Sequence, residues 1–577
     1  MSSFITAIIY DTGRYVVYNQ YCSRTRLANL CYTNLCDKKM LRNPKYVYGP
    51  RNVLVPANIN FGDYFLEKVW PFRNNVAMIN GATDERLTYA DIIQQAMNFA
   101  ISLTRIGVRK GDTIALFAEN RQEFWGAVVG VACAGAVLTT INTGYVKDEL
   151  IHVTNISKPK YFIISPSMYD IHAKTIRSLK SVKKIIVFGN ERKQNTLSFD
   201  DMALEKNGLI KNVNYEEFQS VEVQGQSDTL LIMYSSGTTG LPKGVMTTHL
   251  SVITACCLPP SHDANKISLT ISPWYHVMGL VGTLTALVTG RTGVYLAKFN
   301  VDTYLKAVEK YQVFQMTVVP PVLVAVCKYK SKYDLSCVRM IYSGAAPLHK
   351  DTIQDVKATF PNVHTVYQGY GATEMTLAVL RYQIIDTIPN KPGSVGCVSP
   401  NTVLKVVDLE TREPLGPNQR GELCAKGELL MKGYVGIGRR SDFDDEGFYK
   451  TGDIAHYDDE GYFYIVDRLK ELIKYKGYQV PPAEIEAVLL QHAGIRDAAV
   501  VGVEDRAAGE LPLAFVVKQP ASTLTEKEVQ DFVAERLSNP KHLRGGVRFV
   551  DQIPKSPAGK ILRKDLRKML KSSKSKL

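Results

Sequence analysis

The sequence predicts an α/β protein with several domains. Its 577 residues exceed what one hydrophobic core usually supports, and 45% of them are hydrophobic, which is enough to build several cores. Short apolar runs at 113–117, 161–164 and 184–188 alternate with helical patterns such as 89–106. This alternation is typical of doubly wound domains. A β-rich stretch punctuated by glycines follows at about 393–433.

The pattern changes between Asp467 and Lys470, where a smaller α+β unit is expected to begin. A helix is predicted over 482–491, with strands at 498–503 and 513–517. The boundary therefore separates a large first domain from a small second one.

Charge and composition exclude some classes of protein. The net charge is +14, and twelve Lys or Arg residues lie within 541–577 against two acidic residues. No nucleic-acid motif or interleaved aromatic residue accompanies this charge, so steering of anionic substrates and a solvated tail explain it better than nucleic-acid binding. The ten cysteines show no CxxC pair and no His spacing suited to a metal, which favours free thiols in a reducing compartment.

Two segments, 124–146 and 269–290, have the length of a membrane span and contain no Lys, Arg, Asp or Glu. Both are rich in Gly, Ala and Thr, and the second contains Pro273 and His276. We therefore expect buried elements of the α/β fold and no transmembrane segment.

The most informative motif is residues 234–245, Tyr-Ser-Ser-Gly-Thr-Thr-Gly-Leu-Pro-Lys-Gly-Val, between an apolar strand and a second extended segment. Glycines let backbone N–H groups approach phosphate oxygens, while hydroxyl groups donate and the lysine adds charge. The spacing differs from a Walker A loop, because Pro242 precedes the lysine and Gly244 follows it. The predicted polyphosphate site comprises Ser235, Ser236, Gly237, Thr238, Thr239, Gly240 and Lys243.

Further motifs follow in a fixed order. They lie at 342–348 (Tyr-Ser-Gly-Ala-Ala-Pro-Leu), 367–374 (Tyr-Gln-Gly-Tyr-Gly-Ala-Thr-Glu), 449–453 (Tyr-Lys-Thr-Gly-Asp), 466–470, 474–480 and 557–560 (Pro-Ala-Gly-Lys). Together they resemble the AMP-forming adenylate enzymes, a family that includes acyl-CoA synthetases, 4-coumarate-CoA ligases and beetle luciferases. Within it, 467–480 and 543–546 look most like the branch of luciferases and insect acyl-CoA synthetases.

The resemblance implies a detailed architecture. A large ATP- and acyl-binding domain at 43–468 would contain two doubly wound subdomains plus a distorted β-barrel. A small mobile α+β domain would span 469–574. ATP, Mg²⁺ and coenzyme A are the implied cofactors.

Adenylation brings a carboxylate against the α-phosphate of ATP, so a cation must lie between two anions. The resemblance assigns this role to Lys560 in the small domain. It places His276 near the reacting carboxylate, Thr373 at the α-phosphate and Glu374 at the metal.

Recognition of the nucleoside follows from its chemistry, because a carboxylate can accept hydrogen bonds from both ribose hydroxyls. By resemblance Asp453 is this carboxylate, Arg468 adds a second contact and Tyr370 offers its ring to adenine. Further nucleotide contacts are implied at Gly344, Ala345, Ala346, Gln368, Gly369 and Gly371. After adenylation the small domain would rotate at Lys470, and the segment containing Lys474 and Gly477 would face the site as the coenzyme A thiol attacks.

The acid itself is predicted from apolar residues around the matched motifs, which favour a medium- or long-chain fatty acid. These residues are Trp274, Tyr275, Met278, Leu280, Met375 and Leu377. A 4-coumarate-type aryl-CoA ligase and a luciferin monooxygenase remain alternatives, although luciferases typically carry serine at the position of Leu377 and phenylalanine at that of Met278. A catalytically dead nucleotide-binding scaffold is a further class, but the residues whose loss would indicate it, Lys243, Glu374, Asp453 and Lys560, are all present.

The two ends of the sequence differ in what they predict. Residues 575–577, Ser-Lys-Leu, match the tripeptide read by the peroxisomal import receptor, so we expect a peroxisomal protein. Residues 1–42 precede the family resemblance, lack the apolar core of a signal peptide and suggest no role.

Overall fold

A computed structural model describes most of the chain. It covers residues 6–11, 14–19, 43–51, 53–205, 209–235, 242–258, 266–344, 348, 350–382, 391–437, 442–476, 478–505, 508–555 and 559–574. The chain forms two compact units, residues 1–46 and 47–577. In the first unit, strands β1 (Thr6–Asp11) and β2 (Arg14–Asn19) pair antiparallel.

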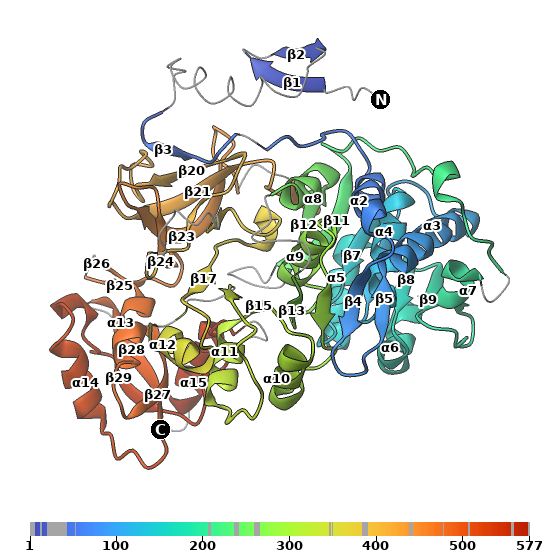
Figure 1. Cartoon of the computed structure of the whole chain (residues 1–577). Coiled ribbons are helices and arrows are strands. Elements are labelled where there is room, and N and C mark those ends of the chain that lie inside the picture. Colours follow the sequence, from blue (N-terminus) through green and yellow to red (C-terminus); the bar gives the residue numbers. More distant parts are fainter. Residues whose placement is uncertain are drawn as a thin grey trace. The chain divides into compact units, whose positions relative to one another are not determined.

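An eight-stranded sheet with the order β10-β9-β8-β6-β7-β11-β12-β22 forms one half of the large domain (Figure 1). Its strands are β6 (Thr113–Phe117), β7 (Val137–Thr140), β8 (Tyr161–Ile164), β9 (Lys184–Val187), β10 (Leu197–Ser198), β11 (Thr229–Ser235), β12 (Lys243–Thr248) and β22 (Gly433–Tyr434). The strands from β10 to β11 run parallel, and every residue of β7 and β8 is buried, as expected for strands covered on both faces. The associated helices are α2 (Phe61–Val69), α3 (Tyr89–Arg105), α4 (Glu123–Cys133), α5 (Lys147–Ser157), α6 (Pro166–Ser178), α7 (Phe199–Ala203) and α8 (His249–Cys256).

A seven-stranded sheet with the order β17-β16-β15-β13-β14-β4-β5 forms the other half. Its strands are β4 (Val76–Asn80), β5 (Arg86–Thr88), β13 (Ser268–Thr270), β14 (Gly293–Tyr295), β15 (Gln315–Val318), β16 (Met340–Ser343) and β17 (Val366–Gln368), and its helices are α9 (Val277–Leu287), α10 (Val301–Lys310), α11 (Pro320–Lys328) and α12 (Lys350–Thr359). All its pairs are parallel except that of β4 with β5. The predicted α/β class with two doubly wound subdomains is confirmed.

The β-rich part differs from the prediction of a distorted barrel. Within the described residues it is an open five-stranded sheet with the order β24-β23-β21-β20-β3. A barrel closes only when its first and last strands pair, and here β24 and β3 stand at opposite edges. The strands are β3 (Tyr46–Tyr48), β20 (Thr402–Val407), β21 (Gly421–Gly427), β23 (Tyr449–Tyr457) and β24 (Phe463–Arg468), and a separate pair is formed by β18 (Leu380–Arg381) and β19 (Cys397–Val398).

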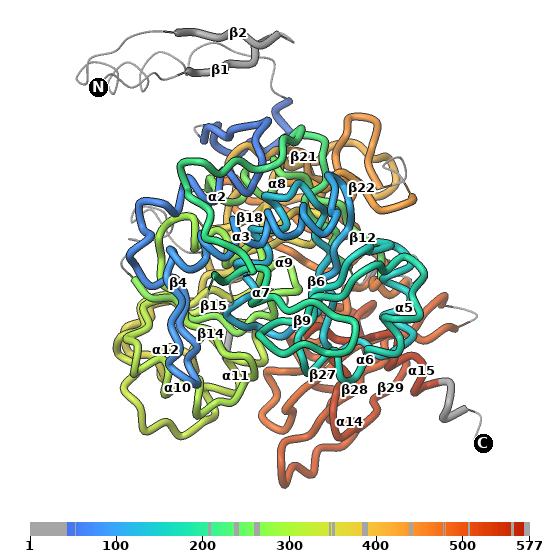
Figure 2. Tube along the Cα trace, turned by 90° about the vertical axis from the view of Figure 1, so that its right-hand side faces the viewer, coloured from blue at the N-terminus to red at the C-terminus, as the bar shows by residue number. Residues whose placement is uncertain are grey.

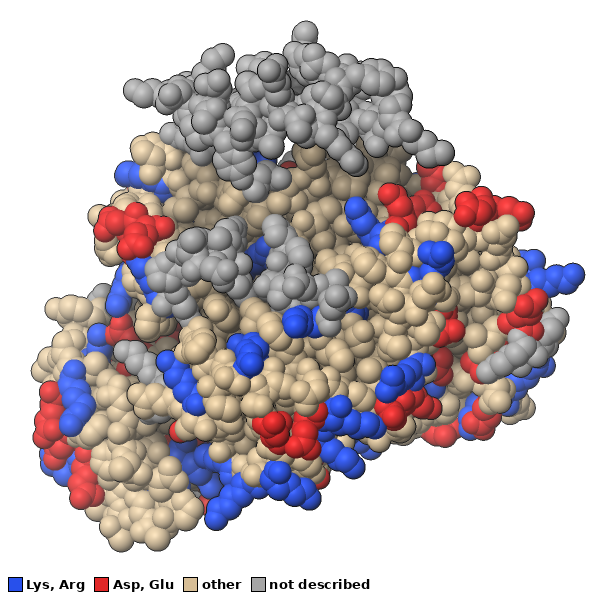
Figure 3. Space-filling model, in the orientation of Figure 1, with Lys and Arg blue, Asp and Glu red and all other residues tan. Residues whose placement is uncertain are grey.

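The C-terminal domain has a sheet and a hydrophobic core of its own. Its strands are β25 (Ile473–Tyr475), β26 (Tyr478–Val480), β27 (Ile495–Asp505), β28 (Gly509–Lys518) and β29 (Gly546–Phe549), and its helices are α13 (Pro482–Leu489), α14 (Glu526–Ala534) and α15 (Arg563–Lys574). Figure 2 shows α14 beside β28 and β29 at the red end of the colour scale. The helix and both strands predicted here are confirmed. On the face shown in Figure 3, Lys and Arg side chains are interspersed with Asp and Glu among the coloured residues.

The two uncharged segments are internal elements. Residues 124–146 contain α4 and β7, and residues 269–290 contain α9 and part of β13. Within the described part of the chain, no helix combines the length and apolar character that crossing a bilayer requires. The expectation of buried elements is confirmed, because nearly all residues of α4 are buried.

A buried histidine links the first helix of the second unit to α8 and predicts acid sensitivity. His249 is 1% exposed, its Nδ1 accepts the backbone N–H of Phe61 at 3.0 Å, and burial lowers its pKa to about 4. The folded state thus favours neutral imidazole, so the stabilisation is complete above the unfolded pKa near 6.5 and is lost as pH falls towards the folded value.

We expect about 3 kcal/mol of stability to be lost through this residue between pH 7 and pH 4. Substitution His249→Gln should lower stability at pH 7 but reduce the acid-induced loss, and denaturant unfolding at several pH values measures both. The exposed His364 provides the matched control, His364→Gln. An equally steep acid loss in His249→Gln and the unmodified protein would contradict the assignment.

Candidate active site

A cavity of about 1260 Å³ is lined by residues of the large domain together with Lys560 of the C-terminal domain. It brings together twelve of the predicted site residues: Ser235, Lys243, His276, Gly344, Gln368, Gly369, Gly371, Thr373, Glu374, Asp453, Arg468 and Lys560. Of the other ten predicted residues, Tyr370 and Lys474 are described but are not among the lining residues. The remaining eight lie outside the described part of the chain: Ser236, Gly237, Thr238, Thr239, Gly240, Ala345, Ala346 and Gly477.

The two ends of the predicted polyphosphate loop meet across a hairpin. Strands β11 and β12 pair antiparallel, with Ser235 directly opposite Lys243. The Tyr234 hydroxyl donates to Ser157 Oγ at 2.7 Å and to the Val153 carbonyl at 2.9 Å, which ties the end of β11 to α5. The first described residue after the loop, Pro242, has its carbonyl 3.0 Å from a ring nitrogen of His152. The loop is thus anchored on both sides.

Tyr434 contacts both Lys243 and Glu374. The Lys243 ammonium lies 4.5 Å from the centroid of the Tyr434 ring, and the Tyr434 hydroxyl donates to Glu374 Oε1 at 2.8 Å. Glu374 belongs to a short 3-10 helix, Thr373–Met375. The helix is followed by Thr376, whose φ angle is positive at 54°. Burial raises the pKa of Tyr434, and the carboxylate beside it adds to the effect. The tyrosine therefore stays protonated and holds the glutamate in one orientation.

Asp453 is held from two sides. It is 5% exposed, accepts the Tyr370 hydroxyl at 2.6 Å and pairs with Arg468 Nε at 2.9 Å. The pair follows from the sheet, because Asp453 on β23 lies opposite Arg468 on β24. Burial raises the pKa of Asp453, whereas Arg468, Tyr370 and Lys560 oppose that rise. Each carboxylate oxygen has a second lone pair, so both can still accept a ligand hydroxyl.

Lys560 reaches the cavity from the C-terminal domain. The residue before it, Gly559, has φ of 80°, and a Cβ built there would lie 2.5 Å from Cγ of Pro321 in α11. Both the positive φ angle and the close approach to Pro321 favour glycine at this position. Burial lowers the pKa of Lys560, Arg468 lowers it further, and Asp453 and Glu471 oppose the change. Lys560 and Asp453 therefore interact electrostatically with each other and with Arg468.

Comparison with known proteins agrees with this geometry. A model of the AMP-binding enzymes matches residues 67–435, and a model of the AMP-binding enzyme C-terminal domain matches 484–560. The chain belongs to the AMP-binding enzyme family. Its relatives include CoA ligases, and this AMP-binding enzyme is accordingly an AMP-forming acid–thiol ligase.

Relatives of this AMP-binding enzyme carry several substrate names. A luciferin 4-monooxygenase of Nipponoluciola cruciata is 40% identical over 87% of this chain and 92% of its own. A 4-coumarate–CoA ligase of Petroselinum crispum is 38% identical over 90% of this chain and 96% of its own. A solved Mycobacterium tuberculosis fatty acyl CoA synthetase has a TM-score of 0.69 and 28% identity, covering 89% of this chain and 99% of its own.

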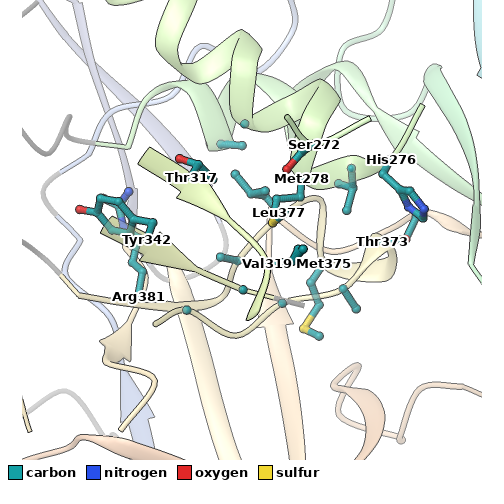
Figure 4. Close-up of a pocket in the computed structure, with 18 of the residues that line it drawn as sticks. Ser272, His276, Met278, Thr317, Val319, Tyr342, Thr373, Met375, Leu377 and Arg381 are labelled. Carbon is teal, nitrogen blue, oxygen red and sulfur yellow. The ribbon is translucent and has the colours of Figure 1, made fainter. Parts of the chain in front are cut away.

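His276, predicted to lie near the reacting carboxylate, is the residue before helix α9 and lines the cavity of the AMP-binding enzyme. Burial lowers the pKa of His276, so its imidazole is neutral near pH 7. Figure 4 shows His276 and Thr373 at one end of the pocket and Tyr342 and Arg381 at the other. The labelled residues between them are Ser272, Met278, Thr317, Val319, Met375 and Leu377.

Two predicted pocket residues of the AMP-binding enzyme belong to the core instead. Trp274 and Leu280 are both fully buried, and the Trp274 ring packs 4.7 Å from Trp125 and 4.9 Å from Tyr295 between ring centroids. Tyr275 is half-buried and lies outside the cavity lining, with its backbone carbonyl accepting from Thr140. In the segment 274–280 the consecutive residues 276–278 line the cavity, whereas Trp274 and Leu280 lie in the core, and apolar character alone does not reveal this division.

Other residues of the site carry no recognisable signal in the sequence. Tyr434, Arg291 and Arg381 line the cavity but fall outside the role-bearing positions of the motifs. Lys474 is described but does not line the cavity, and its backbone N–H donates to Glu510 Oε2 at 2.8 Å. In this orientation of the C-terminal domain, Lys560 faces the site and Lys474 does not.

Proposed function

We propose that this enzyme is an acyl-CoA synthetase for medium- or long-chain fatty acids, acting through an acyl-AMP with release of pyrophosphate and then AMP. The observation that carries the proposal is the wall of the acyl cavity between its two polar ends. Met278, Val319 and Leu377 present thioether and aliphatic groups there, which suit a methylene chain. A solved fatty acyl CoA synthetase is also among the related structures.

In the first half-reaction, a carboxylate oxygen attacks the α-phosphorus of ATP and the bond to pyrophosphate breaks. The Lys560 ammonium lowers the repulsion between the two anions and stabilises the charge on the pentavalent transition state. Burial has already removed much of the water around this ammonium, so little further solvation is lost when the two anions bind. The neutral His276 can donate a hydrogen bond to the acid and fix its approach, and Thr373 can donate to the α-phosphate.

The remaining predicted residues hold the nucleotide. The loop 235–240 and Lys243 bind the phosphates, Asp453 and Arg468 bind the ribose, and Tyr370 lies at the adenine with Gly344 and the residues after it. Because Asp453 is already fixed by two hydrogen bonds, little conformational entropy is lost when ribose binds.

Magnesium fits the same site. Within the described residues no group of three or more His, Cys, Asp and Glu side chains lies together, so no complete protein cage is present there. Mg²⁺ commonly binds through one carboxylate with phosphates and water, and the buried, oriented carboxylate of Glu374 meets that requirement. When bound, the ion would neutralise phosphate charge and aid the departure of pyrophosphate.

The second half-reaction requires Lys560 to leave. We propose that the C-terminal domain rotates at Lys470, which itself lines the cavity, so that the segment with Lys474 and Gly477 replaces the Lys560 loop. The coenzyme A thiol then attacks the acyl carbon, and AMP leaves with the electron pair of the broken C–O bond.

Two alternatives are kept because of specific relatives. A 4-coumarate-type ligase and a luciferin monooxygenase share the adenylation step with the proposed function. The purified protein would be assayed for exchange of labelled pyrophosphate into ATP, and for AMP release with and without coenzyme A, on octanoate, dodecanoate, hexadecanoate, 4-coumarate and luciferin. The highest kcat/KM on a fatty acid supports the proposal. A preference for 4-coumarate, or light from luciferin and oxygen, would overturn it.

Peroxisomal import is proposed from the last tripeptide, which lies outside the described residues and directly follows α15. Deletion of residues 575–577 is expected to leave kcat/KM within about twofold and to move the protein from peroxisomes to the cytosol. Fluorescence microscopy of tagged full-length and shortened chains measures the location. Leu577→Ala, which changes only the last residue of the tripeptide, is a second test variant. Continued import of both variants would contradict this use of the tripeptide.

A further inference from the structure

The N-terminus of helix α13 in the C-terminal domain is capped by the large domain. The N-cap residue of this helix is Pro481, which makes no side-chain cap hydrogen bond, because proline has no side-chain oxygen to accept a first-turn N–H. Asp467 on strand β24 takes this role, since its Oδ2 accepts the backbone N–H of Ala483 at 2.9 Å. Helix α13 and β24 lie side by side (Figure 1). The cap of α13 therefore comes from the other side of Lys470.

Asp467 is buried and fixed on the large-domain side. It is 9% exposed, and its Oδ1 accepts the backbone N–H of Arg468 at 2.7 Å. Leu469 donates its backbone N–H to the Gly452 carbonyl at 2.8 Å, which ties the same stretch of chain to β23. A hydrogen bond from an N–H group to a buried carboxylate is among the stronger ones in proteins. Moving α13 away from β24 therefore carries a free-energy cost at Asp467.

A second contact between the two domains lies one residue further along α13. Arg420, the residue before strand β21 of the large domain, donates through its guanidinium to Glu484 Oε1 at 2.7 Å. The other oxygen of Glu484 pairs with Lys541 of the C-terminal domain. The Arg420 side chain is 55% exposed, so its ion pair is expected to contribute less than the buried bond at Asp467. Both contacts hold the first turn of α13.

We propose that Asp467 and Arg420 are positioning residues for adenylation, which hold the first turn of α13 and so keep the C-terminal domain in the arrangement that presents Lys560 to the cavity. This inference rests on the proposed rotation at Lys470 and names contacts that the rotation must break. Because α13 and Lys560 belong to one domain, a rotation that withdraws Lys560 also moves α13 away from β24. Neither Asp467 nor Arg420 lines the cavity, so each acts on the reaction only through the position of Lys560.

The balance between the two half-reactions measures this hold in the full-length protein. Adenylation needs the docked arrangement and thioester formation needs the rotated one, so the ratio of the two rates follows the equilibrium between the arrangements. Pyrophosphate exchange measures adenylation of whichever acid in the panel above has the highest kcat/KM. Single-turnover thioester formation from the synthetic adenylate of that acid measures the second half-reaction. A residue needed only for folding would lower both rates together.

Variants at the two contacts should shift this balance in one direction. Asp467→Ala is expected to raise the ratio of thioester formation to adenylation about 10-fold, because a hydrogen bond to a carboxylate is lost in the docked arrangement alone. Arg420→Met should raise the ratio about two- to threefold, as expected for an exposed ion pair. In a Glu484→Gln background the Arg420→Met change should have no further effect, because its partner is already altered.

Matched controls remove equivalent contacts that lie within one domain. Thr525 caps helix α14 inside the C-terminal domain, so Thr525→Ala should lower stability and leave the ratio unchanged. Arg192 is exposed and pairs with Asp201 of the same domain, so Arg192→Met should leave the ratio unchanged as well. Thermal unfolding verifies that each variant is folded.

The outcomes separate this inference from the function on which it rests. An unchanged ratio in Asp467→Ala, or equal losses in its two half-reactions, would overturn the inference and leave the ligase proposal intact. A rise of the same size in Thr525→Ala would overturn it too, because lower stability would then account for the shift. If the unmodified protein supports exchange with no acid in the panel, both proposals fail. Should Asp467→Ala not fold, the exposed Arg420→Met and its combination with Glu484→Gln decide.

Discussion

Replacing Lys560 with alanine is expected to slow adenylation about 1000-fold and to leave thioester formation from supplied acyl-AMP within about threefold. The reason is electrostatic: the lysine supplies the cation between carboxylate and α-phosphate only while the C-terminal domain is docked by Gly559 on Pro321. Once acyl-AMP exists, this repulsion is gone and the side chain has no further role. Pyrophosphate exchange measures the first half-reaction, and single-turnover thioester formation from synthetic acyl-AMP measures the second.

A matched control lies in the same segment. Lys555 is bonded to Asp497 at 2.7 Å and does not line the cavity, so Lys555→Ala should affect neither half-reaction more than about twofold. Equal losses in both half-reactions of Lys560→Ala would show that the lysine acts through folding or domain position. The division of roles would then be wrong.

Asp453→Asn is expected to raise the KM for ATP about 100-fold, because charge-assisted bonds to the ribose hydroxyls are weakened. The asparagine keeps the shape of the side chain but no longer compensates the Arg468 guanidinium, and the depressed Lys560 pKa should fall further since Asp453 is one of the groups that raise it. A lower thermal midpoint is expected for the same reason. Initial-rate kinetics and thermal unfolding measure these effects.

A nucleotide without ribose hydroxyls tests whether the weaker ATP binding of Asp453→Asn arises from a lost contact with the ribose. Dideoxy-ATP, which lacks both ribose hydroxyls, should be a poor substrate for the unmodified protein and no poorer for Asp453→Asn. Tyr370→Phe keeps the ring and the carboxylate but removes the 2.6 Å bond, and is expected to cost about 10-fold. Additive losses from the variant and the altered nucleotide would contradict a direct contact between Asp453 and ribose.

Elements with a strong local pattern could be predicted from the sequence. The apolar strand before the 234–245 motif and the extended segment after it appear as β11 and β12, since each is defined by hydrophobic periodicity and turn residues close in sequence. The helix predicted over 482–491 is α13, shorter by two residues at its end. The loop motif indicated Lys243, the family resemblance indicated Asp453 and Lys560, and all three line the cavity.

What could not be predicted depends on contacts between distant segments. The Lys243–Tyr434–Glu374 cluster joins three separate parts of the chain, and no local pattern indicates that Tyr434 will meet the other two. Trp274 is predicted in the pocket because it is one of the apolar residues around the matched motifs, but its direction is set by packing on Trp125. The sequence analysis did not identify Arg291 and Arg381 as lining residues for the same reason, because a single arginine in a mixed sequence does not show where its side chain points.

The contact between Gly559 and Pro321 affects when the enzyme can cleave ATP. The cation needed to cleave ATP is present only in the docked arrangement, and the thiol is proposed to enter only in the rotated one. A nucleotide bound while the small domain is undocked would therefore persist unhydrolysed. Bulk at position 559 would separate the two contact surfaces, and the enzyme would then remain a thioester-forming catalyst that depends on ready-made adenylate.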